Sequence, residues 1–564
     1  MKFQEMPYAR LEVSDMGSKL EGLLEQFNNA QDLEGCLNAY KAIDDYGKEI
    51  STANNLAYIR NSLDTTDAYY DAEKSYWDEA WPQIQPQIKA ISAALLASPY
   101  RSQLEEKWGK LMFENESLSL KTFTPEIVAD LQEENRLGTE YDKLVASALI
   151  EFDGKTLTLA QLGPYYESPD RAVRKAAMEA ANNWRMTHKA AWDDIFNDLV
   201  KIRTTIGKKL GHENFVQVGY YRMQRNCYDK EMVARFREGV IKYIVPLVSQ
   251  IKEAQRKRIG VDALKMYDDP FEYPSGNATP KGTPEEIFAH GQKMYQELSP
   301  ETAEFFDYML ERDLFDVLTR KGKSGGGYCH TLPKYGAPFI FANFNGTSGD
   351  IDVLTHEAGH AYAAYLARDI YPSALGDYAA ETAEIHSMAM EFLTWPWMEG
   401  FFKEDTDKYY YSHLASALVF LPYGCMVDEF QHHIYEKPEM THTQRNELWL
   451  SLEAVYRPHL DKSDIDFMAQ GRGWQRQAHI YEMPFYYIDY CLAQIVALSF
   501  WAKSQQNREE AWAKYHRLVS LAGTKTFVEL LEDAQMPSPF VSDNLKLVSD
   551  EAQKFLDGHE MKLG

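Results

Sequence analysis

The chain has 564 residues, more than one hydrophobic core usually supports, so we expect at least two domains or lobes. An apolar fraction of 45%, with 23 prolines and 32 glycines, excludes a disordered or collagen-like chain. The 59 basic and 85 acidic residues leave a net charge of −26, which repels phosphate backbones and anionic lipids. We therefore expect neither nucleic acid nor a membrane surface as a partner.

The five cysteines are widely scattered, and none stands in a CxxC spacing. This pattern argues against a disulfide framework and against a cysteine zinc site, and it favours reduced thiols. The first residues contain no apolar core of a secretory signal. The least polar stretch, residues 415–427, is too short to cross a bilayer and contains Pro422. A soluble cytoplasmic protein is the expectation.

Most of the chain shows the three- and four-residue apolar spacing of helices, as in residues 18–43. Ser168 and Pro169 are typical of a helix start, as N-cap and first helical residue. The proline- and glycine-rich residues 268–286 predict a surface excursion rather than a domain linker. The best strand signal is residues 338–345.

The expected fold is therefore mainly α-helical with one small β-sheet. Lobe size alone places a boundary near residue 200, which gives an N-terminal helical lobe of residues 1–200 and a catalytic domain of residues 201–564.

One motif carries most of the chemical information, namely His356-Glu357-Ala358-Gly359-His360. On a helix, positions i and i+4 share a face, so both imidazoles can reach one metal ion. Glu357 lies beside them, where its carboxylate can accept a proton from metal-bound water. The alternative interpretation is a buried helix whose histidines bond to neighbouring groups.

A catalytic zinc ion needs a third protein ligand and an open position for water. The metzincin pattern requires glycine at position 363 and histidine at 366, and Ala363 and Leu366 exclude that class. Three acids downstream, Glu381, Glu384 and Glu391, share a helix face by three- and seven-residue spacing. Spacing does not choose between Glu381 and Glu384 as ligand. The other acid is expected to orient a ligand histidine.

HEAGH followed by ETAEIHSMAME resembles the thimet oligopeptidase/oligoendopeptidase F family of zinc metallopeptidases, most closely the bacterial Pz-peptidase-type oligopeptidases. In that family the third ligand begins an E-x-x-S-x-x-x-E pattern, which reads EIHSMAME here. The resemblance thus implies Glu384 as ligand and Glu381 in the second shell. It also implies two helical lobes around a deep channel. It covers the C-terminal two-thirds of the chain, whereas the first 200 residues share only a general helical pattern.

A second group of chemically capable residues lies in QAHIYEMPFYYIDYCLAQ. Hydroxyls and an imidazole near a metal can stabilise the anionic intermediate of amide hydrolysis, although a tyrosine-rich core patch is the alternative interpretation. The family resemblance implies that His479, Tyr487 and Tyr490 are these donors. Because the loop is about one residue shorter than in the thimet branch, Tyr486 can take the place of Tyr487.

The segment YCHTLPKYGAPFIFANFNGTSGD precedes the zinc helix. Its strand is expected to offer an edge to an extended peptide, through main-chain hydrogen bonds that tolerate many side chains. The family resemblance supports such a substrate platform, here Phe341, Ala342 and Asn343. An ordinary internal strand is the alternative.

These observations predict a zinc-dependent endopeptidase with one Zn²⁺ per chain, acting on short oligopeptides as a monomer or homodimer. The expected mechanism is Glu-assisted attack of zinc-bound water on the scissile carbonyl. The alternatives are a zinc carboxypeptidase of similar helical channel fold and a non-catalytic peptide-binding protein.

Overall fold

The computed structural model describes residues 1–320 and 322–563, and its helices account for most of them. The N-terminal helices are α1 (Val13–Asn28), α2 (Leu33–Leu63), α3 (Ala68–Ala97), α4 (Arg101–Trp108), α5 (Lys110–Leu120), α6 (Val128–Ala146), α7 (Gly163–Tyr166), α8 (Arg171–Thr187), α9 (Lys189–Lys209) and α10 (Val216–Arg222). They are followed by α11 (Lys230–Arg258), α12 (Pro284–Leu298), α13 (Pro300–Glu311), α14 (Gly349–Ala367), α15 (Ala380–Leu393), α16 (Met398–Phe402), α17 (Thr406–Glu436) and α18 (His442–Tyr456). The last are α19 (Asp466–Ala469), α20 (Ala478–Glu482), α21 (Tyr487–Gln506), α22 (Arg508–Ser520), α23 (Phe527–Asp533) and α24 (Ser542–Leu563).

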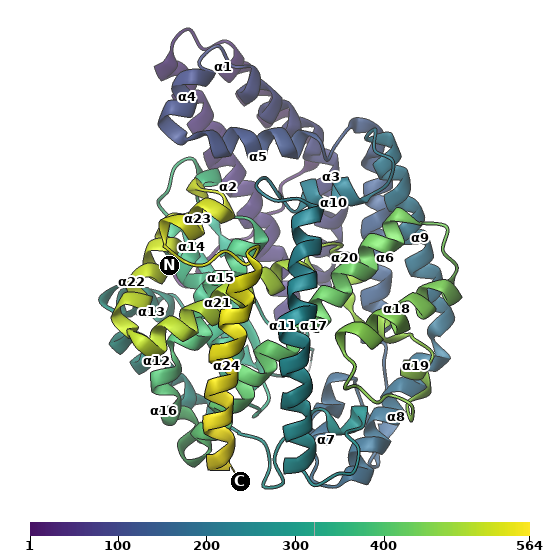
Figure 1. Ribbon diagram of the computed structural model, residues 1–564. Helices are drawn as coiled ribbons and strands as arrows, with labels where there is room; N and C mark the ends of the chain where they lie inside the picture. Colours follow the sequence, from purple (N-terminus) through teal and green to yellow (C-terminus); the bar gives the residue numbers. More distant parts are fainter. Residues whose placement is uncertain (321, 564) are drawn as a thin grey trace.

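The hydrophobic side chains form two large cores. The smaller one lies among α1 to α5 and includes Trp77 and Trp108. Helices α1, α4 and α5 project above the rest of the molecule in Figure 1. The larger core takes in nearly everything else, and it includes residues of α6, α8 and α9. Residues 1–200 thus contribute to both cores, and the division at residue 200 stays a prediction.

The prediction of a mainly helical chain is confirmed, with local differences at helix ends. Helix α8 begins two residues later than expected, because the side chain of Asp170, rather than Ser168, accepts the hydrogen bond from the Ala172 amide. The excursion between α11 and α12 is packed against the protein. Asp268 in it is fully buried and is bound by arginines of α8.

The small sheet has three strands, β3 (Phe315–Leu318), β4 (Tyr328–Leu332) and β5 (Ala337–Phe344), in the order β3-β5-β4. Strand β5 is parallel to β3 and antiparallel to β4, so both of its edges are paired. The expectation that this strand would offer an edge to a peptide was wrong. A separate hairpin of β1 (Ile150–Phe152) and β2 (Lys155–Leu157) was not predicted.

Of the three residues expected to form the substrate platform, two are buried inside the sheet and Asn343 is half-buried. Phe341 and Ala342 are at most 1% exposed, and the ring of Phe341 stacks on Tyr328 of β4. The Asn343 amide donates hydrogen bonds to the carbonyls of Ser324 and Gly326. These three residues support the sheet and the glycine-rich segment before β4, and the edge strands are β3 and β4.

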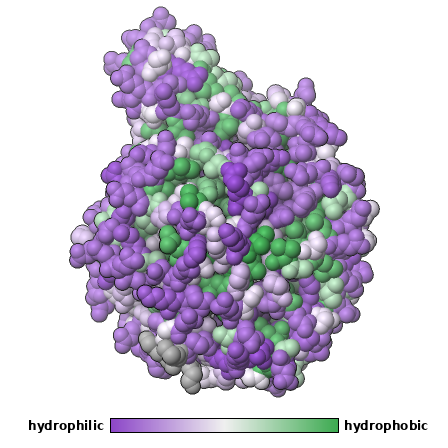
Figure 2. Space-filling view, in the orientation of Figure 1, coloured by the Kyte–Doolittle hydropathy of each residue, from purple (hydrophilic) through white to green (hydrophobic). Residues whose placement is uncertain are grey.

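The outer surface is largely hydrophilic on the face shown in Figure 2, with hydrophobic residues showing mainly toward its middle. Among the described residues, no helix is both long and apolar enough to pass through a lipid bilayer.

Candidate active site

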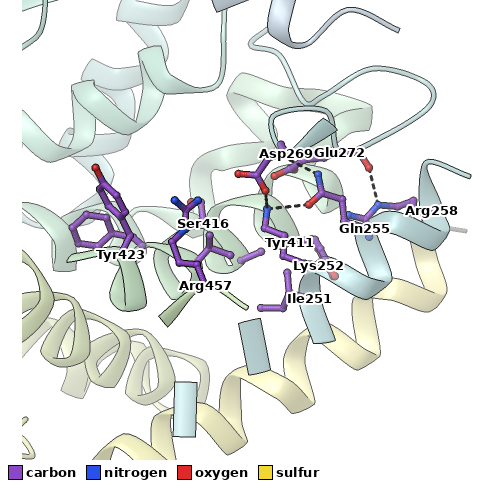
Figure 3. Close-up of a pocket in the computed structure, with 13 residues that line it drawn as sticks. Ile251, Lys252, Gln255, Arg258, Asp269, Glu272, Tyr411, Ser416, Tyr423 and Arg457 are labelled. Carbon is purple, nitrogen blue, oxygen red and sulfur yellow. Dashed lines mark hydrogen bonds and ion pairs between the residues drawn. The ribbon is translucent and has the colours of Figure 1, made fainter. Parts of the chain in front are cut away.

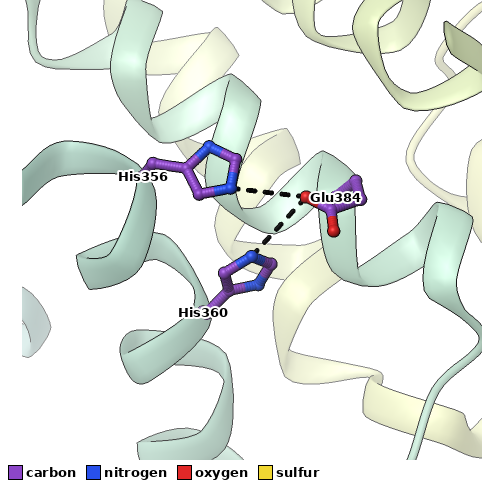
Figure 4. Close-up of side chains that lie close together, drawn as sticks. All are labelled: His356, His360 and Glu384. Carbon is purple, nitrogen blue, oxygen red and sulfur yellow. Dashed lines mark ion pairs between the residues drawn. The ribbon is translucent and has the colours of Figure 1, made fainter. Parts of the chain in front are cut away.

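Three potential metal ligands converge where α14 packs on α15 (Figure 4). Nε2 of His356 lies 3.4 Å from Oε2 of Glu384, and Nε2 of His360 lies 3.6 Å from the same oxygen. Burial alone would raise the pKa of Glu384, but the two histidines hold it well below its ordinary value. The carboxylate is therefore ionised, as a metal ligand must be.

The close approach of the two helices depends on Gly359. A Cβ atom at this position would lie 2.3 Å from the carbonyl oxygen of His386 and 2.7 Å from Cα of Ser387. The start of α14 is fixed by Asp350, whose carboxylate accepts hydrogen bonds from the amides of Asn345 and Gly346, both at 2.8 Å. The turn after β5 thereby sets the register from which both histidines project.

Glu391 is the carboxylate that orients a ligand histidine. Its Oε1 accepts a hydrogen bond from Nδ1 of His356 at 2.7 Å, and its Oε2 is 2.8 Å from Nε2 of His413 on α17. This bond leaves Nε2 of His356 free to face a metal. Glu381 was expected to orient a ligand histidine, and in the structure Glu391 makes that contact. Glu381 lies one helical turn before Glu384, where it is buried near Asp489.

Glu357 lies beside the three ligands and is 7% exposed. Its Oε2 is buried and has no hydrogen-bond partner among the described residues. Burial raises the pKa of Glu357, although the adjacent histidines oppose this. A Cβ atom on Gly327 would lie 3.6 Å from Oε1 of Glu357, so the glycine-rich segment passes close to this carboxylate. Oε2 of Glu357 is thus available to accept a proton.

Residues 477–494, the tyrosine-rich segment, reach the same site from α20 and α21. The hydroxyl of Tyr486 donates to Oε1 of Glu384 at 2.5 Å, and the rings of Tyr486 and Tyr490 lie 5.0 Å apart. The ring of His479 is 5.8 Å from each of them. The ring of Tyr487 lies nearer to His479, at 4.9 Å, and packs against Tyr423 at 5.9 Å, but its hydroxyl has no hydrogen bond to a ligand among the described residues. In this arrangement Tyr486, rather than Tyr487, points to the ligands.

This orientation comes from a strained residue, Phe485, whose φ of 70° is the left-handed region that bulky residues avoid. Its carbonyl accepts a hydrogen bond from the fully buried Arg225, and its amide donates to Gln431 at 2.9 Å. Its ring fits over Gly219 of α10, where a Cβ atom would lie 2.3 Å away. Arg203 of α9 binds the loop further upstream, at the carbonyls of residues 480 and 481.

A cavity of about 740 Å³ opens beside the site, between α2 and α3 on one side and α14 and α15 on the other. Tyr486 is among the residues that line it. Thr331 of β4 lines it as well, and the carbonyl of Thr331 accepts a hydrogen bond from Asn55 of α2 at 2.7 Å. The sheet therefore faces the cavity through β4 and not through β5.

The donor set fits a zinc ion. Zinc bound to nitrogen and oxygen at 2.0–2.2 Å places tetrahedral ligands about 3.4 Å from one another. The distances of 3.4 and 3.6 Å from Glu384 match this value, and suitable atoms of all three residues lie within 4.8 Å of one another. Neutral imidazole and carboxylate ligands are also those that zinc prefers.

Sequence reasoning missed the residues that support the site. The seven-residue spacing from Glu384 to Glu391 was a usable signal. Seven residues turn a helix to within about 20° of its starting direction, so the two side chains point to the same side. The three-residue spacing from Glu381 to Glu384 leaves an angle of about 60° between the side chains. The positions of Arg203, Arg225 and Gly219 carried no local signal. They act through contacts with residues more than 250 positions away in the chain.

Comparisons with known proteins agree with this site. A model of the peptidase M3 N-terminal domain matches residues 3–123, and a model of peptidase family M3 matches residues 165–547. The group B oligopeptidase PepB of Streptococcus agalactiae serotype III (strain NEM316) is 23% identical over 477 residues, which are 78% of this chain and 75% of PepB. The structure of Pz peptidase A with an inhibitor matches with a TM-score of 0.96 and 48% identity over 99% of both chains.

A crystal structure assigned to oligoendopeptidase F matches over 100% of both chains, with a TM-score of 0.97 and 46% identity. The family resemblance seen in the motifs around His356 and Glu384 is confirmed by these matches. Since the family M3 model covers well over half of its length, this chain belongs to peptidase family M3 and is a metallo-oligopeptidase.

Proposed function

We propose that the protein is a zinc-dependent endopeptidase that cleaves short oligopeptides inside the cell. The observation that carries the proposal is the convergence of His356, His360 and Glu384 beside the unpartnered carboxylate of Glu357. The chemistry that a zinc ion supplies at such a site is Lewis acidity, which polarises a carbonyl group and lowers the pKa of water. The five free cysteines support the cytoplasmic location.

In the proposed mechanism, Glu357 accepts a proton from the attacking water and later delivers it to the leaving amine. Tyr490 and His479, together with Tyr486 or Tyr487, donate hydrogen bonds to the oxyanion that forms. Tyr486 must release Glu384 to do so, since its hydroxyl donates to that carboxylate. Glu391 holds His356 in the tautomer that presents Nε2.

The substrate class follows from the space beside these groups. The cavity of about 740 Å³ between the N-terminal helices and α14–α15 supports a channel that admits extended peptides. We propose that peptides bind along β4, whose edge faces this cavity, and that folded proteins are excluded by the surrounding helices. Oligopeptides are then the partners, whether the protein acts as a monomer or a homodimer.

The test is to strip the protein with a chelator, measure its zinc content, and follow cleavage of a quenched fluorescent peptide of about eight residues before and after zinc is restored. We expect about one zinc ion per chain and activity that returns with the metal. Full activity of the stripped protein would refute the proposal. A casein-sized unfolded chain and a folded protein serve as controls for the size limit.

A further inference from the structure

A second cavity, of about 310 Å³, is lined by residues of α11 and α17 and by Arg457 (Figure 3). Besides α11, α17 and Arg457, which follows α18, the excursion between α11 and α12 lines it. Its volume is at the lower end of the range for small-molecule sites. It therefore has room for the end of a peptide and not for a folded chain.

This cavity shares a wall with the candidate active site. Phe420 and Tyr423 line it, and their rings lie 5.6 and 5.9 Å from the ring of Tyr487. The hydroxyl of Tyr423 donates to Gln477 at 2.9 Å, and the amide nitrogen of Gln477 lies 2.8 Å from Nδ1 of His479. The ring of Tyr487 lies 4.9 Å from that of His479 and 5.9 Å from that of Tyr423, which lines the cavity. Because an extended peptide advances about 3.4 Å per residue, about three to four residues span this distance.

Most charged groups of the cavity wall are paired. Nζ of Lys252 lies 2.7 Å from Oδ1 of Asp269. Arg258 binds both carboxylate oxygens of Glu560, at 2.8 and 2.9 Å. Glu272 accepts a hydrogen bond from the hydroxyl of Ser412. Two of the three cations that line the cavity thus have close carboxylate partners.

The third cation, Arg457, is different. Its side chain is only 14% exposed, and its Nε is buried without a hydrogen-bond partner among the described residues. Glu453 is 3.9 Å from Nη1 and is held more closely by Lys462. Burial would raise the pKa of Asp269, but Lys252 and, after it, Arg457 keep this pKa at about 2. Asp269 is therefore an anion near Arg457, and its close partner is Lys252. The guanidinium of Arg457 has donors to spare, in the planar arrangement that suits a carboxylate.

We propose that this cavity binds the C-terminal residue of a peptide substrate, with its α-carboxylate on Arg457 and its side chain against Phe420 and Tyr423. The inference rests on the proposed function, because it places the leaving-amine part of a cleaved peptide in this cavity. It adds a specificity-determining residue that lies outside the metal site. An acidic side chain has the same carboxylate chemistry, and the experiment separates the two sources.

The experiment measures peptide binding by isothermal titration calorimetry to the Glu357→Gln variant, in which cleavage is suppressed. One peptide sequence of eight residues is compared as the free acid and as the C-terminal amide. We expect the free acid to bind about 10- to 100-fold more tightly, as for a charged hydrogen bond in a buried site. A third peptide carries glutamate as its last residue and an amidated end. Equal affinity for acid and amide, or tight binding of this third peptide alone, would overturn the proposal.

Variants of Arg457 in the same Glu357→Gln background show whether this residue is responsible. Arg457→Gln should remove the preference for the free acid and leave binding of the amide unchanged, whereas Arg457→Lys should keep part of the preference. Arg136→Gln on α6, where the side chain is 56% exposed, changes the net charge equally and should keep all of it. If Arg457→Gln weakens both peptides equally, the residue is structural and the proposal fails.

Failure of the proposed function would look different. In that case the zinc-loaded wild-type protein would cleave neither the acid nor the amide, while the difference in their affinities would still test Arg457. If both peptides are cleaved and their affinities do not differ, the function stands and the carboxylate site does not.

Discussion

The sharpest prediction distinguishes Glu391 from Glu381, two acids of α15. Glu391 bridges His356 and His413 through hydrogen bonds of 2.7 and 2.8 Å, so Glu391→Gln replaces two charge-assisted bonds by neutral ones. The loss of one bond to a charged group costs about 1.5–3 kcal/mol, and removal of such a support typically weakens metal binding 10- to 100-fold. We expect a loss in this range for zinc.

Glu381→Gln is the matched control. Burial, and after it the neighbouring Asp489, raise the pKa of Glu381 well above its ordinary value and so favour its neutral form. Glutamine then preserves both its shape and its charge, and zinc affinity should stay at the wild-type value. Affinities are measured by competition with a chelator of known zinc affinity, and melting temperatures of the metal-free proteins check the fold. Greater zinc loss in Glu381→Gln than in Glu391→Gln would refute this reasoning.

Three further predictions concern turnover. Glu357→Gln should retain zinc and lower kcat by about a hundredfold or more, and near-normal turnover would mean that another group activates the water. Tyr486→Phe should lower kcat by about 10²- to 10³-fold with little change in melting temperature. Tyr487→Phe should leave kcat unchanged. The reverse result would show that the two tyrosines exchange places during catalysis. Gly219→Ala should lower both stability, by about 1–3 kcal/mol, and kcat, because its Cβ atom would strike the ring of Phe485; a change in stability alone would separate the loop from catalysis.

Local chemistry made the metal ligands predictable. His356 and His360 stand one helical turn apart, and this spacing alone places them on one face. The structure brings Glu384 to the same point on an adjacent helix, as the family pattern implied. Helical periodicity likewise identified the fold class, since a 3.6-residue pattern is a property of each segment by itself.

Features that depend on long-range pairing were not predictable in this way. The residues of β5 read as a strand, but nothing in them reveals that β3 and β4 pair with both edges. The choice between Tyr486 and Tyr487 depends on the left-handed backbone of Phe485, and that conformation is stabilised by Arg225 from another part of the chain. Glycine is the residue that commonly adopts a positive φ, so a phenylalanine at this position gives no indication of the turn.

The attachment of the tyrosine-rich segment to α9 and α10 has a consequence for how this enzyme can be altered. Every metal donor lies on α14 and α15, while the groups that aim the hydroxyls lie about 130 residues or more upstream, at Arg203, Gly219 and Arg225. The metal ligands and the hydroxyl donors are therefore positioned by different parts of the chain, and the hydrogen bond from Tyr486 to Glu384 links them. Substitutions in α10 can slow turnover without changing any ligand, so zinc content and turnover have to be measured together to recognise such a defect.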